Sequence, residues 1–235
     1  MNNAGVMLVP EHKKTEQGFE MTVGVNHFGH FMLTGLLLPL LAASATDAAV
    51  DTRVVAVGSI AAASGAAVKG LDFDNLNAEK GYGKIDAYCW SKLMNLLFVA
   101  QFNVWAAGRG LAVKALAAHP GYTATNLQRT MPCATCCNCC VASDVAQGAL
   151  PILRAAVDPG AAAGAYFGPD GTGQMAGNPA PVPLPPAAQD AATAGKLWTV
   201  SETLTGVAFD AALGGGVTGA APSAGAAASA GGEAK

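Results

Sequence analysis

The sequence predicts an α/β fold in which a doubly wound parallel sheet carries helices on both faces. Two observations predict it. Short apolar runs of strand type alternate with longer segments whose apolar residues recur at helical spacing. The order along the chain is helix, strand, helix, strand, helix, strand, which is typical of parallel strands joined by helices. With 235 residues the chain is long enough for one sizeable domain.

Each element follows from a local pattern of apolar residues and breakers. The predicted elements are a helix over 18–45, a strand over 53–57, a helix over 86–107, a strand over 111–118, a helix capped by Ser143 and Asp144 through 156, a strand over 165–167 and a helix over 190–206. Five prolines between Asn178 and Pro186 predict an extended connection. We place the domain at residues 1–210 and expect the Ala/Gly-rich tail, residues 211–235, to be disordered.

Composition excludes several classes of partner and environment. A formal net charge of -3 and 12% charged residues leave no basic stripe for nucleic acid. The longest apolar run, 31–43, contains Pro39 and falls short of the ~20 residues that span a bilayer, so we expect no transmembrane segment. The N-terminus shows no targeting signal. Cys89 and five cysteines within 133–140 do not resemble a disulfide framework, which favours a reducing intracellular compartment such as cytoplasm or plastid.

Tyr88 and Lys92 lie four residues apart on one predicted helix, so the phenol and the ammonium share a face. Alone this spacing is weak evidence, because a half-buried Tyr beside a Lys is common in ordinary helices. Its context strengthens it. Ser59 follows the predicted strand 53–57, and the carboxyl ends of parallel strands line the crevice where ligands bind in open sheets.

Five motifs in a fixed order give the chain a specific resemblance. They are Asn2-Asn3-Ala4-Gly5, the stretch 24–31 (GVNHFGHF), Ser59, Tyr88-Cys89-Trp90-Ser91-Lys92 and His119-Pro120-Gly121. In this order they resemble the short-chain dehydrogenase/reductase superfamily over residues 1–207. The stretches 71–77 and 166–171 are similar to its branch of retinol dehydrogenases, WW-domain oxidoreductases and protochlorophyllide reductases. The resemblance implies a Rossmann-like sheet.

The resemblance also implies an activity and roles for four residues. The activity is NAD(P)-dependent hydride transfer between a carbonyl and an alcohol, on a small-molecule substrate for which an apolar compound is one candidate. Tyr88 would be the general acid/base, Lys92 would lower its pKa and hold the nicotinamide ribose, and Ser59 would position the substrate oxygen. Asn26 would support a water relay to Lys92. An Asn bonded to backbone in a helix irregularity explains it equally well.

The cofactor implied is NADP or NAD, with NADP favoured by the resemblance. Its nicotinamide would lie against Pro120 and Gly121, with Thr123 and Thr125 bonding the carboxamide or the phosphates. An ordinary turn is the alternative reading of Pro120-Gly121. Asn3, Ala4 and Gly5 would lie beside the adenosine half.

One expected part has no counterpart in the sequence. The family's phosphate-binding Gly-rich turn precedes Asn-Asn-Ala-Gly, and the three α/β crossovers before that motif need roughly 80 to 90 residues. The sheet is therefore expected to be incomplete, lacking its first strands, and we hypothesise that an internal Met was taken as Met1. Activity of this chain is then open, and a non-catalytic truncated remnant or an interaction module is the alternative function.

The remaining signals support no separate site. The cysteines within 133–140 contain overlapping C-x-x-C pairs, for which zinc binding, acylation and a substrate-loop segment are all readings; the last fits best, because the pairs are too crowded for two zinc knuckles. No metal site is predicted. We interpret His27 and His30 as packing residues and Trp198 as a core anchor.

Overall fold

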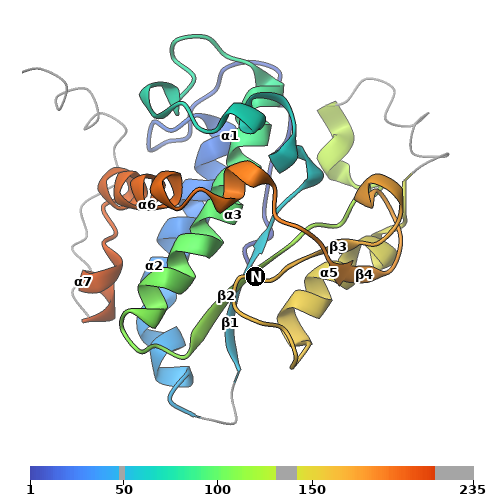
Figure 1. Cartoon of the computed structure of the whole chain (residues 1–235). Coiled ribbons are helices and arrows are strands. Elements are labelled where there is room, and N and C mark those ends of the chain that lie inside the picture. The colour runs from blue at the N-terminus through green and yellow to red at the C-terminus, as the bar shows by residue number, and fades with distance from the viewer. Residues whose placement is uncertain (48–50, 131–141, 215–235) are drawn as a thin grey trace, which may run out of the picture.

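A four-stranded sheet runs through the middle of the molecule with helices on both faces (Figure 1). The computed structural model describes residues 1–47, 51–130 and 142–214. In order across the sheet the strands are β1 (Thr52–Val57), β2 (Val113–Ala118), β3 (Tyr166–Pro169) and β4 (Pro179–Pro181). β1, β2 and β3 are parallel and β4 is antiparallel to β3. The predicted α/β class with a parallel sheet is confirmed.

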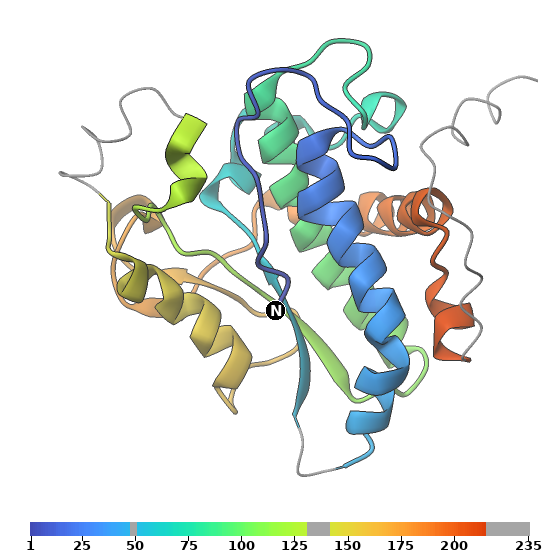
Figure 2. The ribbon, with the colours of Figure 1, turned by 180° about the vertical axis from the view of Figure 1, so that it is seen from behind.

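The helices divide between the two faces of the sheet. The longer ones are α2 (Gly29–Ser44), α3 (Lys84–Ala107), α5 (Val145–Val157) and α6 (Ala191–Thr205), with the short α1 (Met21–Val23) and α7 (Phe209–Leu213). Short 3-10 turns are η2 (Ile60–Ala63), η3 (Gly65–Lys69), η4 (Phe73–Asn75), η5 (Asn126–Thr130), η6 (Thr172–Gln174) and η7 (Pro186–Gln189). Helices α2 and α3 lie on one face and α5 on the other, as Figures 1 and 2 show from opposite sides.

Strand residues alternate between two apolar clusters, which explains why residues 54–57 of β1 and 115–118 of β2 are all apolar. Val54 and Ala56 belong to the larger cluster on the α3 side, whereas Val55 belongs to the smaller cluster on the α5 side. β2 repeats the pattern, with Ala117 in the larger cluster and Leu116 in the smaller one. Because successive side chains point to opposite faces, a strand covered on both sides must be apolar at every position.

The first helix differs from the sequence expectation. It begins at Met21, where the Glu20 carboxylate accepts hydrogen bonds from the Thr22 and Val23 amides at 2.9 and 2.8 Å. It then passes through a π-helical segment, η1 (Gly24–Phe28), before continuing as α2. The joined helix of 24 residues, 21–44, is long and apolar enough to cross a membrane, although an 18-residue window of it is 39% buried against the protein. The expectation of no such segment, which rested on the shorter run 31–43, is therefore not confirmed.

Two further elements were missed in the sequence. The proline-rich stretch predicted as an extended connection contains β4, which pairs Pro179 with Pro169 and Ala180 with Gly168 at the edge of the sheet, where prolines are tolerated. Helix α7 continues the folded chain to Leu213, past the boundary at residue 210. The expected disorder of the tail concerns residues that, from 215 on, lie outside the described part.

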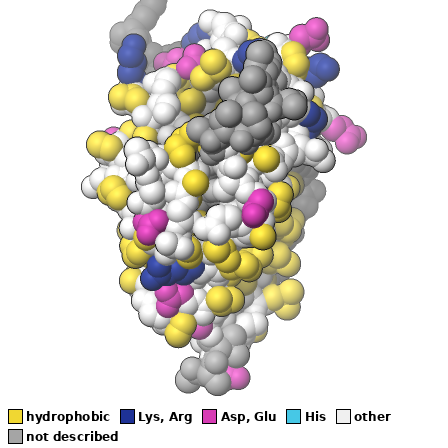
Figure 3. Space-filling view, turned by 90° about the vertical axis from the view of Figure 1, so that its right-hand side faces the viewer, with side chains coloured by type: hydrophobic (Ala, Val, Ile, Leu, Met, Phe, Trp, Pro, Cys, Tyr) yellow, Lys and Arg dark blue, Asp and Glu magenta, His cyan; other side chains and the backbone are white. Residues whose placement is uncertain are grey.

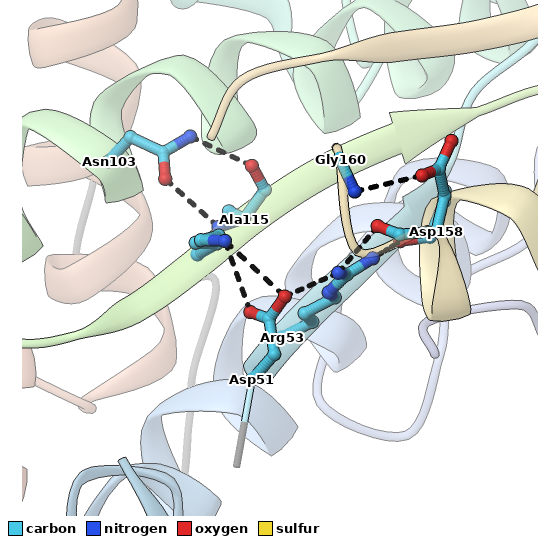
Figure 4. Close-up of polar contacts among 8 residues, drawn as sticks. Asp51, Arg53, Asn103, Ala115, Asp158 and Gly160 are labelled. Carbon is cyan, nitrogen blue, oxygen red and sulfur yellow. Dashed lines mark hydrogen bonds and ion pairs between the residues drawn. The ribbon is translucent and has the colours of Figure 1, made fainter. Parts of the chain in front are cut away.

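An ionic cluster joins β1 to the end of α5 at the amino ends of the strands (Figure 4). Arg53 donates to the carbonyls of Ala155 and Asp158 at 3.0 and 2.7 Å and also pairs with Asp51. The last carbonyls of a helix are unpaired and carry partial negative charge, so a buried cation there stabilises the end of α5. Lys114 of β2 completes the cluster 3.3 Å from Asp51.

Exposed apolar side chains lie on the outer face of α5. Figure 3 views this side of the molecule and shows hydrophobic side chains gathered over its lower half. Helix α5 contributes Val145, Leu150, Leu153 and Val157, which are 61%, 37%, 47% and 71% exposed. The outer face of α2 is similar, with exposed Leu33, Leu36, Leu37 and Leu40. The two helices thus leave apolar surface uncovered on both sides of the sheet.

We predict that Phe209→Ala destabilises the chain by about 3–5 kcal/mol, the usual range for truncating a buried Phe. Phe209 is fully buried, and its ring lies 4.5 Å from that of Trp198 and 4.8 Å from that of Phe31. Urea unfolding followed by tryptophan fluorescence measures the change. Val104→Ala on the exposed side of α3 is the control. A loss below about 1 kcal/mol would show that α7 is not part of the core.

Candidate active site

A cavity of about 690 Å³ opens at the carboxyl ends of the parallel strands. The Arg53 cluster lies at the other end of the same strands. This volume is typical of small-molecule sites. Its walls come from the N-terminal segment, the end of β1, the start of α3, the loop after β2 and α5. The lining includes Asn3, Ala4, Gly5, Ser59, Tyr88, Lys92, Pro120, Gly121, Thr123 and Thr125. Of the residues proposed from the sequence, Asn26 alone does not line it.

Ser59 and Tyr88 meet at the wall where β1 ends. Ser59 is extended, with φ −167° and ψ 155°, and caps η2 because its hydroxyl accepts a hydrogen bond from the Ala61 amide at 3.1 Å. Tyr88, on the second turn of α3, is only 8% exposed. Burial raises the pKa of Tyr88, and a hydrogen bond with the Ser59 side chain partly offsets that rise. The phenol therefore stays protonated at neutral pH.

Lys92 lies one helical turn beyond Tyr88 and is buried. Its ammonium nitrogen donates to the carbonyl of Val57 at 3.0 Å and lies 5.8 Å from the centre of the Tyr88 ring. Burial lowers the pKa of Lys92 to about 8. We expected Lys92 to lower the pKa of Tyr88. The net shift of the Tyr88 pKa is upward, because burial of the phenol dominates, so a lowering by Lys92 stays a prediction.

Asn26 is fully engaged within the π-helical segment. Its amide oxygen accepts from the Val6 amide at 2.9 Å, and its amide nitrogen donates to the Val6 carbonyl at 3.0 Å and to the Ser91 hydroxyl at 2.9 Å. These contacts match the reading of an Asn that bonds backbone in a helix irregularity. They hold the N-terminal segment against the start of α3. The backbone carbonyl of Asn26 accepts a hydrogen bond from Nδ1 of His30 at 3.0 Å.

The N-terminal segment brings Asn3, Ala4 and Gly5 to the cavity by extending the sheet. Asn2 donates its amide to the Val55 carbonyl at 2.8 Å, and its carbonyl accepts from the Val57 amide at 3.2 Å. This parallel bridge sets the segment beside the end of β1. Gly5 is closely packed, since a Cβ there would lie 3.2 Å from Asn26 Oδ1.

The turn after β2 supplies the opposite wall. Gly121 has φ +70°, and a Cβ there would lie 2.3 Å from the Met175 carbonyl, so only glycine fits. The Thr123 hydroxyl donates to the Pro120 carbonyl at 2.9 Å and lies 3.1 Å from the Ser143 hydroxyl. Thr125 accepts from the Leu127 amide at 3.3 Å. Both hydroxyls thus shape this loop and keep acceptor capacity toward the cavity.

Sequence analysis did not predict several of the residues that line the cavity. They are Val6, Met7, Asn126, Leu127, Gln128, Arg129, Val145, Gly148, Ala149 and Ile152, together with Val57, Gly58, Ile60, Ala61 and Tyr122. No motif marks them, because most are apolar or small and reach the cavity only through the packing of η5 and α5 over it. The capping residue Asp144, which accepts from the Gln147 amide at 2.7 Å, was the one signal that placed the start of α5.

The other signals from the sequence lie apart from the cavity. His27 and His30 are buried, and His27 Nε2 lies 2.9 Å from the Ser201 hydroxyl, consistent with packing residues. Trp198 is 7% exposed among the rings of the core, as expected for an anchor. The cysteine cluster within 133–140 lies outside the described residues. In the part of the chain that the structure describes, no group of three or more His, Cys, Asp or Glu is arranged to hold a metal ion.

Comparison with known proteins adds independent evidence. No family model matches the chain. It is 35% identical over 216 residues to retinol dehydrogenase 14 of Homo sapiens, covering 88% of this chain and 58% of that protein. It is 45% identical over 130 residues to retinol dehydrogenase 13 of Homo sapiens, covering 55% of this chain and 36% of that one. A crystal structure of an uncharacterized protein from Mycobacterium paratuberculosis superposes with a TM-score of 0.68 at 37% identity, covering 88% of this chain and 66% of the other.

The fold and the cavity define a Rossmann-like α/β protein, with a Ser, a Tyr and a Lys at the carboxyl edge of the sheet. The chain belongs to the short-chain dehydrogenase/reductase family, in its retinol dehydrogenase branch. It spans little more than half the length of retinol dehydrogenase 14.

We predict that Lys92→Met stabilises the chain at pH 7, because a buried ammonium is replaced by an apolar side chain of similar length. The direction in which the stability of the wild-type chain changes with pH follows from the lowered pKa of Lys92. Between pH 8 and 10.5 the unfolded chain holds the Lys92 proton and the folded chain does not, so wild-type stability rises with pH there. The advantage of Lys92→Met should shrink over this window by up to about 3 kcal/mol.

Urea unfolding of both chains at several pH values measures this difference. Lys69→Met is the control, because Lys69 is exposed on η3 and its removal should leave the pH dependence unchanged. A stability difference between wild type and Lys92→Met that is constant from pH 7 to 10.5 would contradict a depressed pKa of Lys92.

Proposed function

We propose that the chain is the catalytic portion of an NAD(P)-dependent oxidoreductase that interconverts a carbonyl and an alcohol by hydride transfer. The observation that carries the proposal is the convergence of Ser59, Tyr88 and Lys92 on one cavity at the carboxyl edge of a parallel sheet. Ligands bind at this edge in open α/β sheets. The nicotinamide cofactor, when bound, supplies or accepts the hydride.

Tyr88 is the general acid/base of this proposal. In the reducing direction its phenol donates a proton to the carbonyl oxygen, and the raised pKa keeps that proton in place at neutral pH until the oxygen becomes basic. The Ser59 hydroxyl, already bonded to Tyr88, holds the same oxygen within reach. In the oxidising direction Tyr88 first passes its own proton to the relay through Lys92, and the phenolate that results takes up the hydroxyl proton of the substrate.

Lys92 assists Tyr88 in two ways. Its ammonium lies near enough to stabilise negative charge that develops on the phenol, and the Val57 carbonyl fixes its position. A pKa of about 8 also lets Lys92 exchange a proton near neutral pH, which suits a relay that restores the Tyr88 proton. Asn26 supports the relay indirectly, because its side chain bonds both Val6 and Ser91 and so holds the N-terminal segment against the start of α3.

The remaining cavity walls fit the cofactor. Pro120 and Gly121 lie on the wall opposite the N-terminal segment, where the nicotinamide ring would pack, and the turn is fixed there because only glycine at position 121 avoids the Met175 carbonyl. Thr123 and Thr125 offer hydroxyl oxygens to the carboxamide or the phosphates, and Asn3, Ala4 and Gly5 line the adenosine side. NADP is preferred over NAD on the family resemblance.

An apolar alcohol or aldehyde is the substrate we propose. Met7, Leu127, Val145 and Ile152 line the cavity, and apolar walls with few polar groups are typical of sites for such ligands. The names of the relatives, retinol dehydrogenases, favour the same class.

The alternative function is that of a non-catalytic remnant or an interaction module. It is favoured by the sequence, which contains no Gly-rich turn that opens a helix after a strand, and by the exposed apolar faces of α2 and α5. Fluorescence titration of the purified chain with NADPH and NADH separates the two. Quenching that saturates at micromolar cofactor supports the oxidoreductase, and no binding at high micromolar cofactor supports the alternative.

We predict that Tyr88→Phe lowers the turnover of a retinoid aldehyde with NADPH by about 10²–10⁴-fold, the usual contribution of a positioned general acid. Cofactor binding should persist, since the ring and Lys92 remain. Loss of NADPH absorbance measures turnover. Tyr82→Phe is the matched control, because Tyr82 lies outside the cavity and donates to the Val9 carbonyl. Equal turnover in the Tyr88→Phe and Tyr82→Phe chains would refute Tyr88 as the acid.

A further inference from the structure

Tyr166, a second buried phenol, contacts the backbone of Ser59 on the side away from the cavity. It begins β3, is 5% exposed and does not line the cavity. Its hydroxyl donates to the backbone carbonyl of Ser59 at 3.3 Å, a carbonyl that also accepts from the Ala62 amide at 3.0 Å. Tyr166 thus reaches the candidate site from the far side of β2, the one strand that lies between β3 and β1.

The fit between Tyr166 and the end of β1 is close. A Cβ at Gly58 would lie 3.2 Å from both the hydroxyl oxygen and a ring carbon of Tyr166, and 3.2 Å from Leu96 of α3. Gly58 is also held by its amide, which donates to the Ala118 carbonyl at 2.8 Å. The phenol therefore supports the turn Gly58-Ser59 by packing as well as by its hydrogen bond.

The other face of the ring supports the opposite wall of the cavity. The Tyr166 ring lies 5.2 Å from that of His119, between ring centres. His119 Nδ1 accepts from the Gly121 amide at 3.2 Å, so the ring proton must be on Nε2, which donates to Gln174 Oε1 at 2.9 Å. Burial lowers the pKa of His119 to about 4, which keeps this neutral tautomer at physiological pH.

We propose that Tyr166 is a positioning residue that holds Ser59 against Tyr88 and, through His119, fixes Ser59 relative to the Pro120-Gly121 turn. The inference rests on the proposed function, because it assigns Ser59 a partner in proton transfer. Tyr166 does not line the cavity, and it acts through its hydrogen bond to the Ser59 backbone carbonyl. Burial raises the pKa of Tyr166, so its phenol remains a donor across the pH range in which Tyr88 works.

The test removes only the donor. Tyr166→Phe keeps the ring against His119 and Gly58, and Ser59→Ala removes the hydroxyl that Tyr166 is proposed to position. Tyr82→Phe is the matched control, since Tyr82 is another phenol that donates to a backbone carbonyl, that of Val9 at 2.7 Å. Each chain is checked for folding by circular dichroism. If Tyr166→Phe does not fold, Tyr166→Met, which also lacks a donor, replaces it.

The readout is the titration of Tyr88 followed by fluorine NMR in chains that carry 3,5-difluorotyrosine at all four tyrosines. Fluorine makes the phenols more acidic, which brings the titration into a milder pH range, and Tyr88→Phe assigns the signal. The Tyr88 pKa should rise in Ser59→Ala and rise in the same direction in Tyr166→Phe, because the hydrogen bond from Ser59 is loosened. Adding Tyr166→Phe to Ser59→Ala should produce no further rise.

This measurement needs neither cofactor nor turnover, so it stands apart from the test of the proposed function. Where turnover is found, Tyr166→Phe should lower kcat by about two- to tenfold with KM unchanged, the range expected for one lost hydrogen bond. An unchanged Tyr88 titration in Tyr166→Phe would overturn the proposal. So would a shift equal to that in Tyr82→Phe, additivity in the double variant, or a Ser59→Ala chain that titrates as wild type.

Discussion

The carbonyl of Val57 is the point on which the site depends. It ends β1, and it accepts hydrogen bonds from Lys92 at 3.0 Å and from Asn95 at 3.1 Å, both on α3. Val57 also donates its amide to the Asn2 carbonyl. The backbone of one residue therefore joins the sheet, the helix that carries Tyr88 and the segment that carries Asn3. A buried carbonyl without such partners would be costly, so the sequence around it is constrained in both elements.

The same burial that orders these groups sets their chemistry. Tyr88 and Lys92 are both shifted toward their neutral forms, since the pKa of the phenol rises and that of the ammonium falls to about 8. In an exposed pair the charges would be screened and neither group would be tuned. Enclosing them costs stability, and residues kept at such a cost are more often functional than structural.

Sequence reasoning predicted those parts of the fold whose patterns are local. The strands ending at Val57 and Ala118, the helix carrying Tyr88, and the Asp144 cap follow from short apolar runs, helical spacing and capping chemistry. Elements that depend on tertiary contacts were missed. β4 pairs two prolines at an edge, and α7 is held by Phe209 in an aromatic cluster gathered from α2, α3 and α6. The depressed pKa of Lys92 needed the burial of its surroundings, which no spacing reveals.

The walls of the cavity differ in how firmly they are built. Tyr88 and Lys92 lie on α3 and Ser59 lies two residues after β1, and both elements pack into the main apolar cluster. The wall formed by the N-terminal segment is held mainly by hydrogen bonds, from Asn2 to the β1 edge, from Asn26 to Val6 and from Thr130 to the Met7 carbonyl at 3.0 Å. Side chains on packed elements keep their geometry without a ligand, whereas a segment held by a few hydrogen bonds opens at lower free energy. The wall that carries Ser59, Tyr88 and Lys92 is therefore preformed, and ligand binding should mostly reorder the wall beside Asn3.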